Sequence, residues 1–326
     1  MMNKLISVSL LLWLLFVSCV SDGEPSEAIY HNNHKQTTPK ILDELKKVND
    51  SFTYSSIEGC SRGFLRGLAI FSADVIGAYE GGKIGGSVGG VVGSAFAGAG
   101  AAPGAGIGAA IGGAIGGIGS SYGMWCTTKG CGRIEYPSIP LISDTYCVIK
   151  AELESNRTDN EVVTIGYLDI PVDVKSLEDI GVIHNAALDK LIYSDQIDIM
   201  PLSNEPGYIG DIDVVHNCWQ LSSLETTVIQ SNEFVDYYDN SMTAIFEGDY
   251  QFSIISDNII SDQIIKLYLE TIENMNNPDF ESIVNFTNQY ISIISDNSDV
   301  TELEKQNLYI AFSVAVYSFK YWYENY

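Results

Sequence analysis

The chain has 326 residues and a formal net charge of −25, with 42 acidic against 17 basic side chains. A protein this acidic repels phosphate backbones, which argues against nucleic acid as a partner. The charge is unevenly placed, because no Asp, Glu, Lys or Arg occurs from Ile84 to Thr128 whereas the second half is rich in Asp and Glu. Composition therefore divides the chain into at least two physically different parts.

The N-terminus has the pattern of a secretory signal. Lys4 precedes an apolar run from Leu5 to Val17, which is too short to span a bilayer as a permanent helix. We therefore expect residues 1–18 to be a signal peptide that is absent from the mature protein. The polar residues 19–39 that follow contain Pro25 and Pro39 and are typical of a linker.

The end of the apolar run carries a family resemblance. Phe16-Val17-Ser18-Cys19 resembles the lipobox of bacterial lipoproteins, with Phe16 where leucine is usual, and Val20 to Glu24 resembles the acidic export tag of Bacteroidota surface lipoproteins. The resemblance implies acylation of Cys19 and a place in the cell envelope, as an outer-membrane lipoprotein that is displayed at the surface. Several acyl chains would anchor the protein firmly. An ordinary signal peptide with an incidental Cys19 is the alternative.

The segment after Ile57 is dominated by glycine at every fourth position. The glycines in this phase are Gly77, Gly81, Gly85, Gly89 and Gly93 and, after a break, Gly104, Gly108, Gly112 and Gly116. This period places them on one stripe of a helix. Glycine costs about 1 kcal/mol relative to alanine in a helix, so such helices need compensation from close backbone packing. The pattern predicts an antiparallel hairpin, with one helix ending near Gly98 and the other running from Gly104 to about Tyr122.

Runs of GxxxGxxxG with Ala, Val and Ile between the glycines resemble the glycine-zipper segments of bacterial membrane and envelope proteins, including pore-forming toxins. The resemblance implies close helix packing. Each uncharged arm has about 18 residues, or roughly 27 Å at 1.5 Å per residue, close to a hydrocarbon core of about 30 Å. Insertion in a membrane, burial in a soluble domain and a disordered tract are the competing interpretations.

The rest of the chain predicts an irregular connector and then a helical bundle. Prolines 137, 140 and 171 indicate the connector, in which Val162 to Ile170 resembles a strand. We expect a disulfide between Cys126 and Cys131, or from one of these two cysteines to Cys60. Helical spacing then recurs in the segments Leu177–Leu191, Asn217–Asn232, Phe234–Phe246, Asp257–Met275, Asp279–Ile294 and Thr301–Tyr323.

The predicted fold class is mainly α, with a glycine-zipper helical hairpin followed by an α-helical bundle. The expected divisions are residues 1–18 as signal peptide, 19–39 as lipid-anchored linker, 40–125 as hairpin, 126–175 as irregular connector and 176–326 as acidic α-helical domain.

Residues with obvious chemistry are scarce. His184 and His216 are weak zinc candidates, and we interpret each imidazole as a buried or capping group. Asp74, one turn before the glycine stripe, is expected in a surface salt bridge. GxSxG, HExxH and paired CxxC motifs are absent from the sequence, so no enzyme and no cofactor is inferred.

The sequence therefore favours a lipid-anchored envelope protein whose hairpin associates with a membrane or with a second copy in a homo-oligomer. One alternative is a surface binding module for an unknown protein or glycan partner, with the hairpin as a packed soluble element. Another is a zinc-dependent enzyme that uses His184 and His216.

Overall fold

The computed structural model describes residues 39–52, 62–95, 100–129, 136–156, 166–193, 221–247, 259–275 and 278–324. Cys19, the linker and His216 lie outside these ranges. The mainly α fold class is confirmed, since regular structure within the ranges is helical throughout. The elements are α2 (Lys40–Phe52), α3 (Arg62–Ala95), α4 (Ala101–Lys129), α5 (Ile139–Asn156), the 3-10 helix η1 (Val172–Glu178), α6 (Asp179–Tyr193), α8 (Ser223–Ile229), α9 (Asn232–Glu247), α10 (Ile260–Glu273), α11 (Phe280–Ser295) and α12 (Glu302–Glu324).

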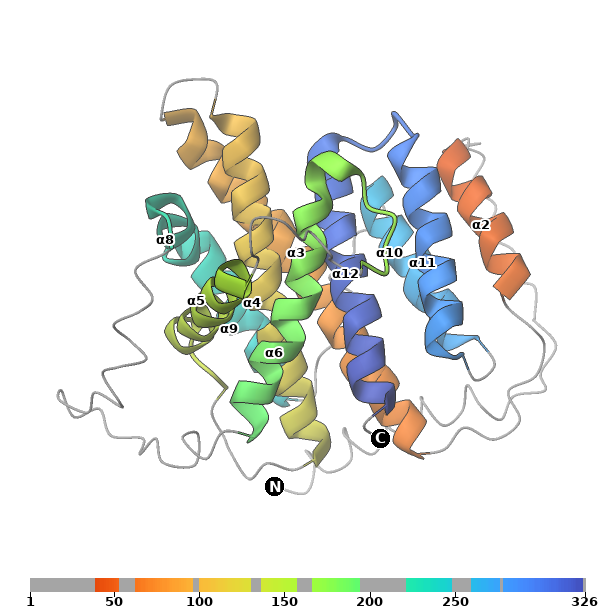
Figure 1. Ribbon diagram of the computed structural model, residues 1–326, viewed down its shortest axis with the longest axis horizontal. Helices are drawn as coiled ribbons and strands as arrows, with labels where there is room; N and C mark the ends of the chain where they lie inside the picture. The colour runs from red at the N-terminus through yellow and green to blue at the C-terminus, as the bar shows by residue number, and fades with distance from the viewer. Residues whose placement is uncertain are drawn as a thin grey trace, which may run out of the picture.

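Helices α3 and α4 lie against one another at the centre of the molecule (Figure 1). A Cβ added to Gly85 would overlap the carbonyl oxygen of Gly108, and one added to Gly108 would overlap the carbonyl oxygen of Gly85. No side chain fits at either position, because backbone meets backbone. The two helices therefore approach as closely as their main chains allow.

The same contact recurs at every turn along the line where α3 and α4 meet, which we name the seam. The facing pairs are Gly77 with Gly116, Gly81 with Gly112, Gly85 with Gly108, Gly89 with Gly104, and Gly93 with Gly100. Numbers rise in α3 as they fall in α4, so the helices are antiparallel. Each glycine stripe is thus filled by the other stripe of the same chain.

Further glycines admit the surrounding helices. Gly82 faces Asn307 and Gly113 faces Ile310, both on α12, while Gly119 faces the ring of Tyr238 on α9. These positions lie outside the four-residue phase of the seam. Because glycine has no side chain, large side chains of the neighbouring helices pack directly against the backbones of α3 and α4 on several faces.

The α3–α4 pair shares one hydrophobic core with the helices that follow. Ile76 of α3, Ile115 of α4, Ile183 of α6 and Phe312 of α12 are each at most 3% exposed and belong to a single cluster of buried side chains. The predicted division between a hairpin at 40–125 and an acidic domain at 176–326 is therefore not a division between separate cores. Burial at about 25 cal/mol per Å² of apolar surface stabilises both parts together.

The predicted connector at 126–175 is wrong in its first half. Helix α4 continues to Lys129, and α5 occupies Ile139–Asn156. Pro140 lies in the first turn of α5, where a missing N–H breaks no helical hydrogen bond. Within the described part of the predicted strand, Gly166 to Ile170 form no strand. Cys126 is a buried thiol, so it does not form the expected bridge, whereas Cys147 is disulfide-bonded.

Helix starts in the C-terminal half follow local capping chemistry. Ser222 and Glu225 form a reciprocal capping box on α8, and the Asp279 side chain accepts a hydrogen bond from the Ser282 N–H at the start of α11. At α12 the Thr301 hydroxyl accepts from the Glu304 N–H at 3.3 Å. These bonds satisfy N–H groups that a helix leaves open at its first turn.

Among the described residues, α4 alone has the length and composition of a membrane span. The stretch Ala101–Thr128 reaches a mean hydropathy of 1.4 in its best window, and 67% of that window is buried inside the protein. Core helices of soluble proteins have the same properties. The composition of α4 is thus explained equally well by its place in the core.

Gly85→Ala is expected to destabilise the protein by about 1–3 kcal/mol, because the added methyl group forces the two backbones apart. Gly67→Ala in the same helix is the matched control, since an added Cβ there has nothing within 4 Å. Alanine at that position should stabilise the helix by up to about 1 kcal/mol. Urea unfolding measures both, and a Gly85→Ala protein at least as stable as the unsubstituted one would contradict the seam geometry.

Candidate functional site

Asp74 is a fully buried carboxyl on α3, and the expectation of a surface salt bridge is wrong. Its Oδ2 accepts hydrogen bonds from the Ser318 hydroxyl and from Trp322 Nε1, the latter at 3.1 Å. Nε2 of His184 lies 3.9 Å from the same oxygen. Ser121 of α4 lies beside the carboxyl. One side chain therefore joins α3 to α4, α6 and α12.

Burial sets the charge of this Asp74 cluster. Desolvation raises the pKa of Asp74 to about 8, against the opposing effect of the nearby polar groups of Ser318, Ser121 and Trp322. Desolvation also lowers the pKa of His184 to about 4. At neutral pH both groups are therefore uncharged, which avoids the large cost of an ion in the protein interior.

Serine, histidine and aspartate together also occur in hydrolase active sites, but the connections here differ. Ser318 donates to Asp74 and not to the imidazole, and His184 Nδ1 lies 3.1 Å from the side-chain oxygen of Asn185. A nucleophilic hydroxyl needs a base beside it. Asp74, His184 and Ser318 are all completely buried, so this cluster holds helices together and does not receive a substrate in this structure.

His184 occupies the buried position that we interpreted for it from the sequence. The structure does not bring it together with His216, which lies outside the described residues. Within the described ranges, no group of three or more His, Cys, Asp and Glu side chains is placed to hold a metal ion. The surroundings of His184 therefore give no support to the zinc alternative.

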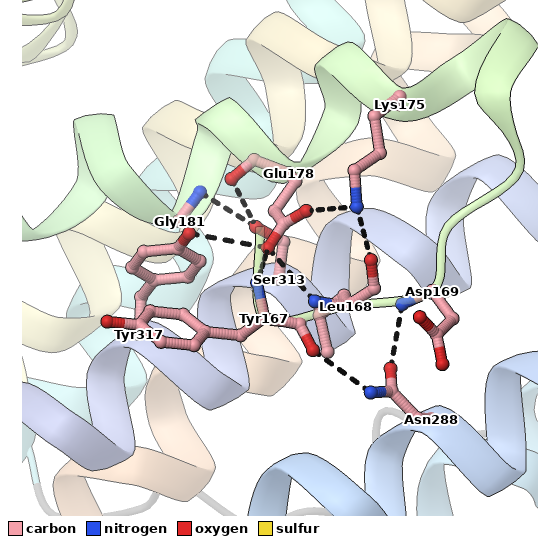
Figure 2. A network of polar contacts seen from close by, with 9 residues as sticks. All are labelled: Tyr167, Leu168, Asp169, Lys175, Glu178, Gly181, Asn288, Ser313 and Tyr317. Carbon is pink, nitrogen blue, oxygen red and sulfur yellow. Dashed lines mark hydrogen bonds and ion pairs between the residues drawn. The ribbon is translucent and has the colours of Figure 1, made fainter. Parts of the chain in front are cut away.

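A second buried cluster is built around Glu178, the last residue of η1 (Figure 2). Its Oε1 accepts hydrogen bonds from the backbone N–H groups of Tyr167, at 2.6 Å, and Leu168, at 3.1 Å. Its Oε2 pairs with Lys175 Nζ at 2.7 Å. The hydroxyl of Tyr317 on α12 also donates to Oε1, at 3.3 Å. A carboxylate here satisfies main-chain donors that no helix or sheet satisfies.

Side chains from other helices complete the Glu178 cluster. Asn288 of α11 donates to the Tyr167 carbonyl at 2.9 Å and accepts from the Asp169 N–H at 2.8 Å. Ser313 of α12 accepts from the Gly181 N–H at 3.0 Å and donates to the Glu178 carbonyl at 2.8 Å. The segment 166–170 is thus bound by side chains in place of a neighbouring strand, as Figure 2 shows.

Sequence reasoning missed both clusters. Asp74 stands in the run Phe71-Ser72-Ala73-Asp74-Val75-Ile76, and its apolar flanks were the signal of burial. Ser318 and Trp322 are spaced i and i+4 on α12, which places both on one face. Glu178 had no comparable local signal, because the backbone groups that it binds belong to residues 167 and 168.

Comparison of the chain with models of known protein families, with curated proteins and with solved structures gave no match.

Asp74→Asn is expected to change how stability depends on pH. The unfolded chain ionises Asp74 near pH 3.8 and the folded protein near pH 8, so the fold loses stability as the pH rises between these values. Asparagine imitates the neutral acid and carries no such loss. In urea unfolding, the free energy of unfolding of Asp74→Asn should increase relative to that of the unsubstituted protein by about 1.4 kcal/mol per pH unit between pH 5 and 8.

His184 supplies a control of opposite sign. Its pKa falls from 6.5 in the unfolded chain to about 4 in the fold, so its contribution to stability is lost as the pH decreases through this interval. Between about pH 4 and 6.5 this effect opposes the loss of stability caused by Asp74. His184→Gln should remove the opposing effect, so that the free energy of unfolding decreases from about pH 4 upward. A pH-independent difference between Asp74→Asn and the unsubstituted protein would mean that the buried carboxyl is ionised.

Glu178→Ala is expected to lower the free energy of unfolding by about 2–3 kcal/mol, because it removes a buried carboxylate that accepts from two backbone N–H groups and pairs with the partly exposed Lys175. Glu152→Ala is the matched control. Glu152 also pairs with a lysine, Lys190, at 3.3 Å, but its side chain is 60% exposed, and its loss should cost under about 1 kcal/mol. Equal losses in thermal unfolding would remove the distinction between the two pairs.

Proposed function

We propose that the protein is a lipid-anchored component of the bacterial cell envelope that acts by contact and not by catalysis, with the α3–α4 pair as its membrane-associating element. The observation that carries this proposal is the lack of any charged residue from Ile84 to Thr128 in a chain whose net charge is −25. The charge-free stretch from Ile84 to Thr128 tolerates hydrocarbon, whereas the remaining acidic surface favours water. The lipobox-like residues ending at Cys19 supply the second support.

The contact between the two glycine stripes within one chain argues against self-association through these stripes. Glycine stripes promote contact between copies when they face outward, but here each stripe lies against the other within one chain. A homo-oligomer would have to use a different surface or exchange helices between copies. Contact with lipid needs neither, and it is therefore the partner that we favour for the α3–α4 pair.

The burial of α4 favours a second candidate function. Much of α3–α4 is enclosed by α6, α8, α9 and α12, which suits a surface binding module for a protein or glycan in which the pair is a packed soluble element. The two proposals differ in what holds the protein at the membrane. In the second, the acyl group on Cys19 is the sole attachment.

Cys19→Ala is expected to abolish incorporation of labelled fatty acid in bacterial cells that express the full chain. Ser21→Ala, two residues further on, is the control and should incorporate label normally. Fractionation of cells that express Cys19→Ala behind a signal peptide that is cleaved without lipid modification then separates the proposals, because only membrane-associated helices keep part of that unacylated protein in the membrane fraction. Full release of Cys19→Ala into the soluble fraction would favour the binding module, and unchanged labelling would exclude Cys19 as the lipid site.

A further inference from the structure

The neighbouring helices do not cover α3 and α4 evenly. The part that we name the exposed end comprises residues 84–95 of α3 and 101–110 of α4. Its outermost part projects beyond the neighbouring helices in Figure 1, whereas Leu303 and Gln306 of α12 still lie against Gly86 and Gly106. Val91 is 70% exposed there and Ile107 is 42% exposed, while Ala95, Ala102 and Pro103 are also exposed. Toward the other ends of both helices, residues 70–82 and 111–123 are buried.

The side chains of the exposed end include few groups that need hydrogen bonds from water. It contains no charged residue, and its hydroxyl side chains are those of Ser87 and Ser94. Ser94 Oγ donates to the Val91 carbonyl of its own helix at 2.7 Å. The backbone is helical within both ranges, so its N–H and C=O groups are paired internally except in the last turn of α3 and the first turn of α4. Moving this surface from water into lipid therefore breaks few hydrogen bonds and removes apolar area from water.

The charge of the chain distinguishes between the partners that this surface could take. Two copies that each carry −25 repel one another, and so do anionic partners. A zwitterionic bilayer has no net charge, and an acyl group on Cys19 would hold the protein beside one. The 19 residues between Cys19 and Pro39 have a contour length of at most roughly 65 Å.

We propose that the exposed end of α3–α4 docks into the interfacial region of a zwitterionic lipid bilayer. This inference rests on the proposed function and names the contact surface. Residues 84–95 extend for roughly 18 Å at 1.5 Å per residue, which is short of a hydrocarbon core of about 30 Å. The remainder of both helices is held in the core by α12 and the Asp74 cluster. The folded protein therefore docks and does not span.

The test uses the chain from Val20 onward, which lacks Cys19 and therefore any acyl group on it. Binding is measured by sedimentation with phosphatidylcholine vesicles. Val91→Asp and Ile107→Asp should each lower the partition coefficient at least tenfold, because they place a charge on the docking surface. Val172→Asp is the matched control, since Val172 is 93% exposed but lies on η1. It should bind like the unsubstituted chain. Thermal unfolding confirms that the exposed substitutions leave the fold intact.

A second readout places the surface directly. Tryptophan fluorescence of Val91→Trp should shift to the blue when vesicles are added, and that of Val172→Trp should not. Equal binding of Val91→Asp and Val172→Asp, or no binding by any form, would overturn docking through the exposed end. The acyl labelling at Cys19 would still decide the proposed function. If the unsubstituted chain is a dimer without vesicles and Val91→Asp is a monomer, the exposed end binds a second copy of the chain, and docking into a bilayer is overturned.

Discussion

The approach of the α3 and α4 backbones is the contact on which the rest of the fold depends. Carbonyl oxygens of one helix lie where the Cβ atoms of the other would be, as at Gly85 and Gly108. Gains in dispersion and in weak Cα–H···O contacts offset the low helix propensity of glycine. The resulting pair is thin enough for α12 and α9 to pack against it with large side chains. One glycine pattern therefore builds both the seam and the centre of a shared hydrophobic core.

Buried polar groups then orient the neighbouring helices around this pair. A hydrophobic surface permits many packing angles, whereas the hydrogen bonds of Asp74 to Ser318 and Trp322 require one. The cluster stays neutral, so it gives directionality without an ion in the interior. Glu178 does the same for the segment before η1 and joins it to α12. The Asp74 cluster is sealed from solvent, whereas the Glu178 cluster reaches the surface at Lys175 and Asp169.

The sequence predicted those features that depend on local periodicity. Helical spacing placed α9, α11 and α12 to within a few residues, and the fold class was correct. Local reasoning failed where the deciding partner is distant: Asp74 is buried by Ser318 and Trp322, and Glu178 binds a segment whose strand-like pattern suggested a sheet. Helix α5 was missed because Pro140 resembles a breaker, although a first turn accepts proline. Exposure of Val91 was equally hidden, since Val91 and buried Val75 have similar apolar surroundings in sequence.

The seam also has a translational symmetry. Its contacts repeat every four residues, so sliding α4 along α3 by one turn, or about 6 Å, would again set glycine opposite glycine. The seam alone is thus degenerate, with several nearly equivalent alignments like the teeth of a ratchet. Features that do not repeat must select one of them, and the single contacts of Asp74 with Ser121 and of Gly119 with Tyr238 are of this kind. The glycine seam by itself would not fix one alignment, and the non-repeating contacts with the surrounding helices do.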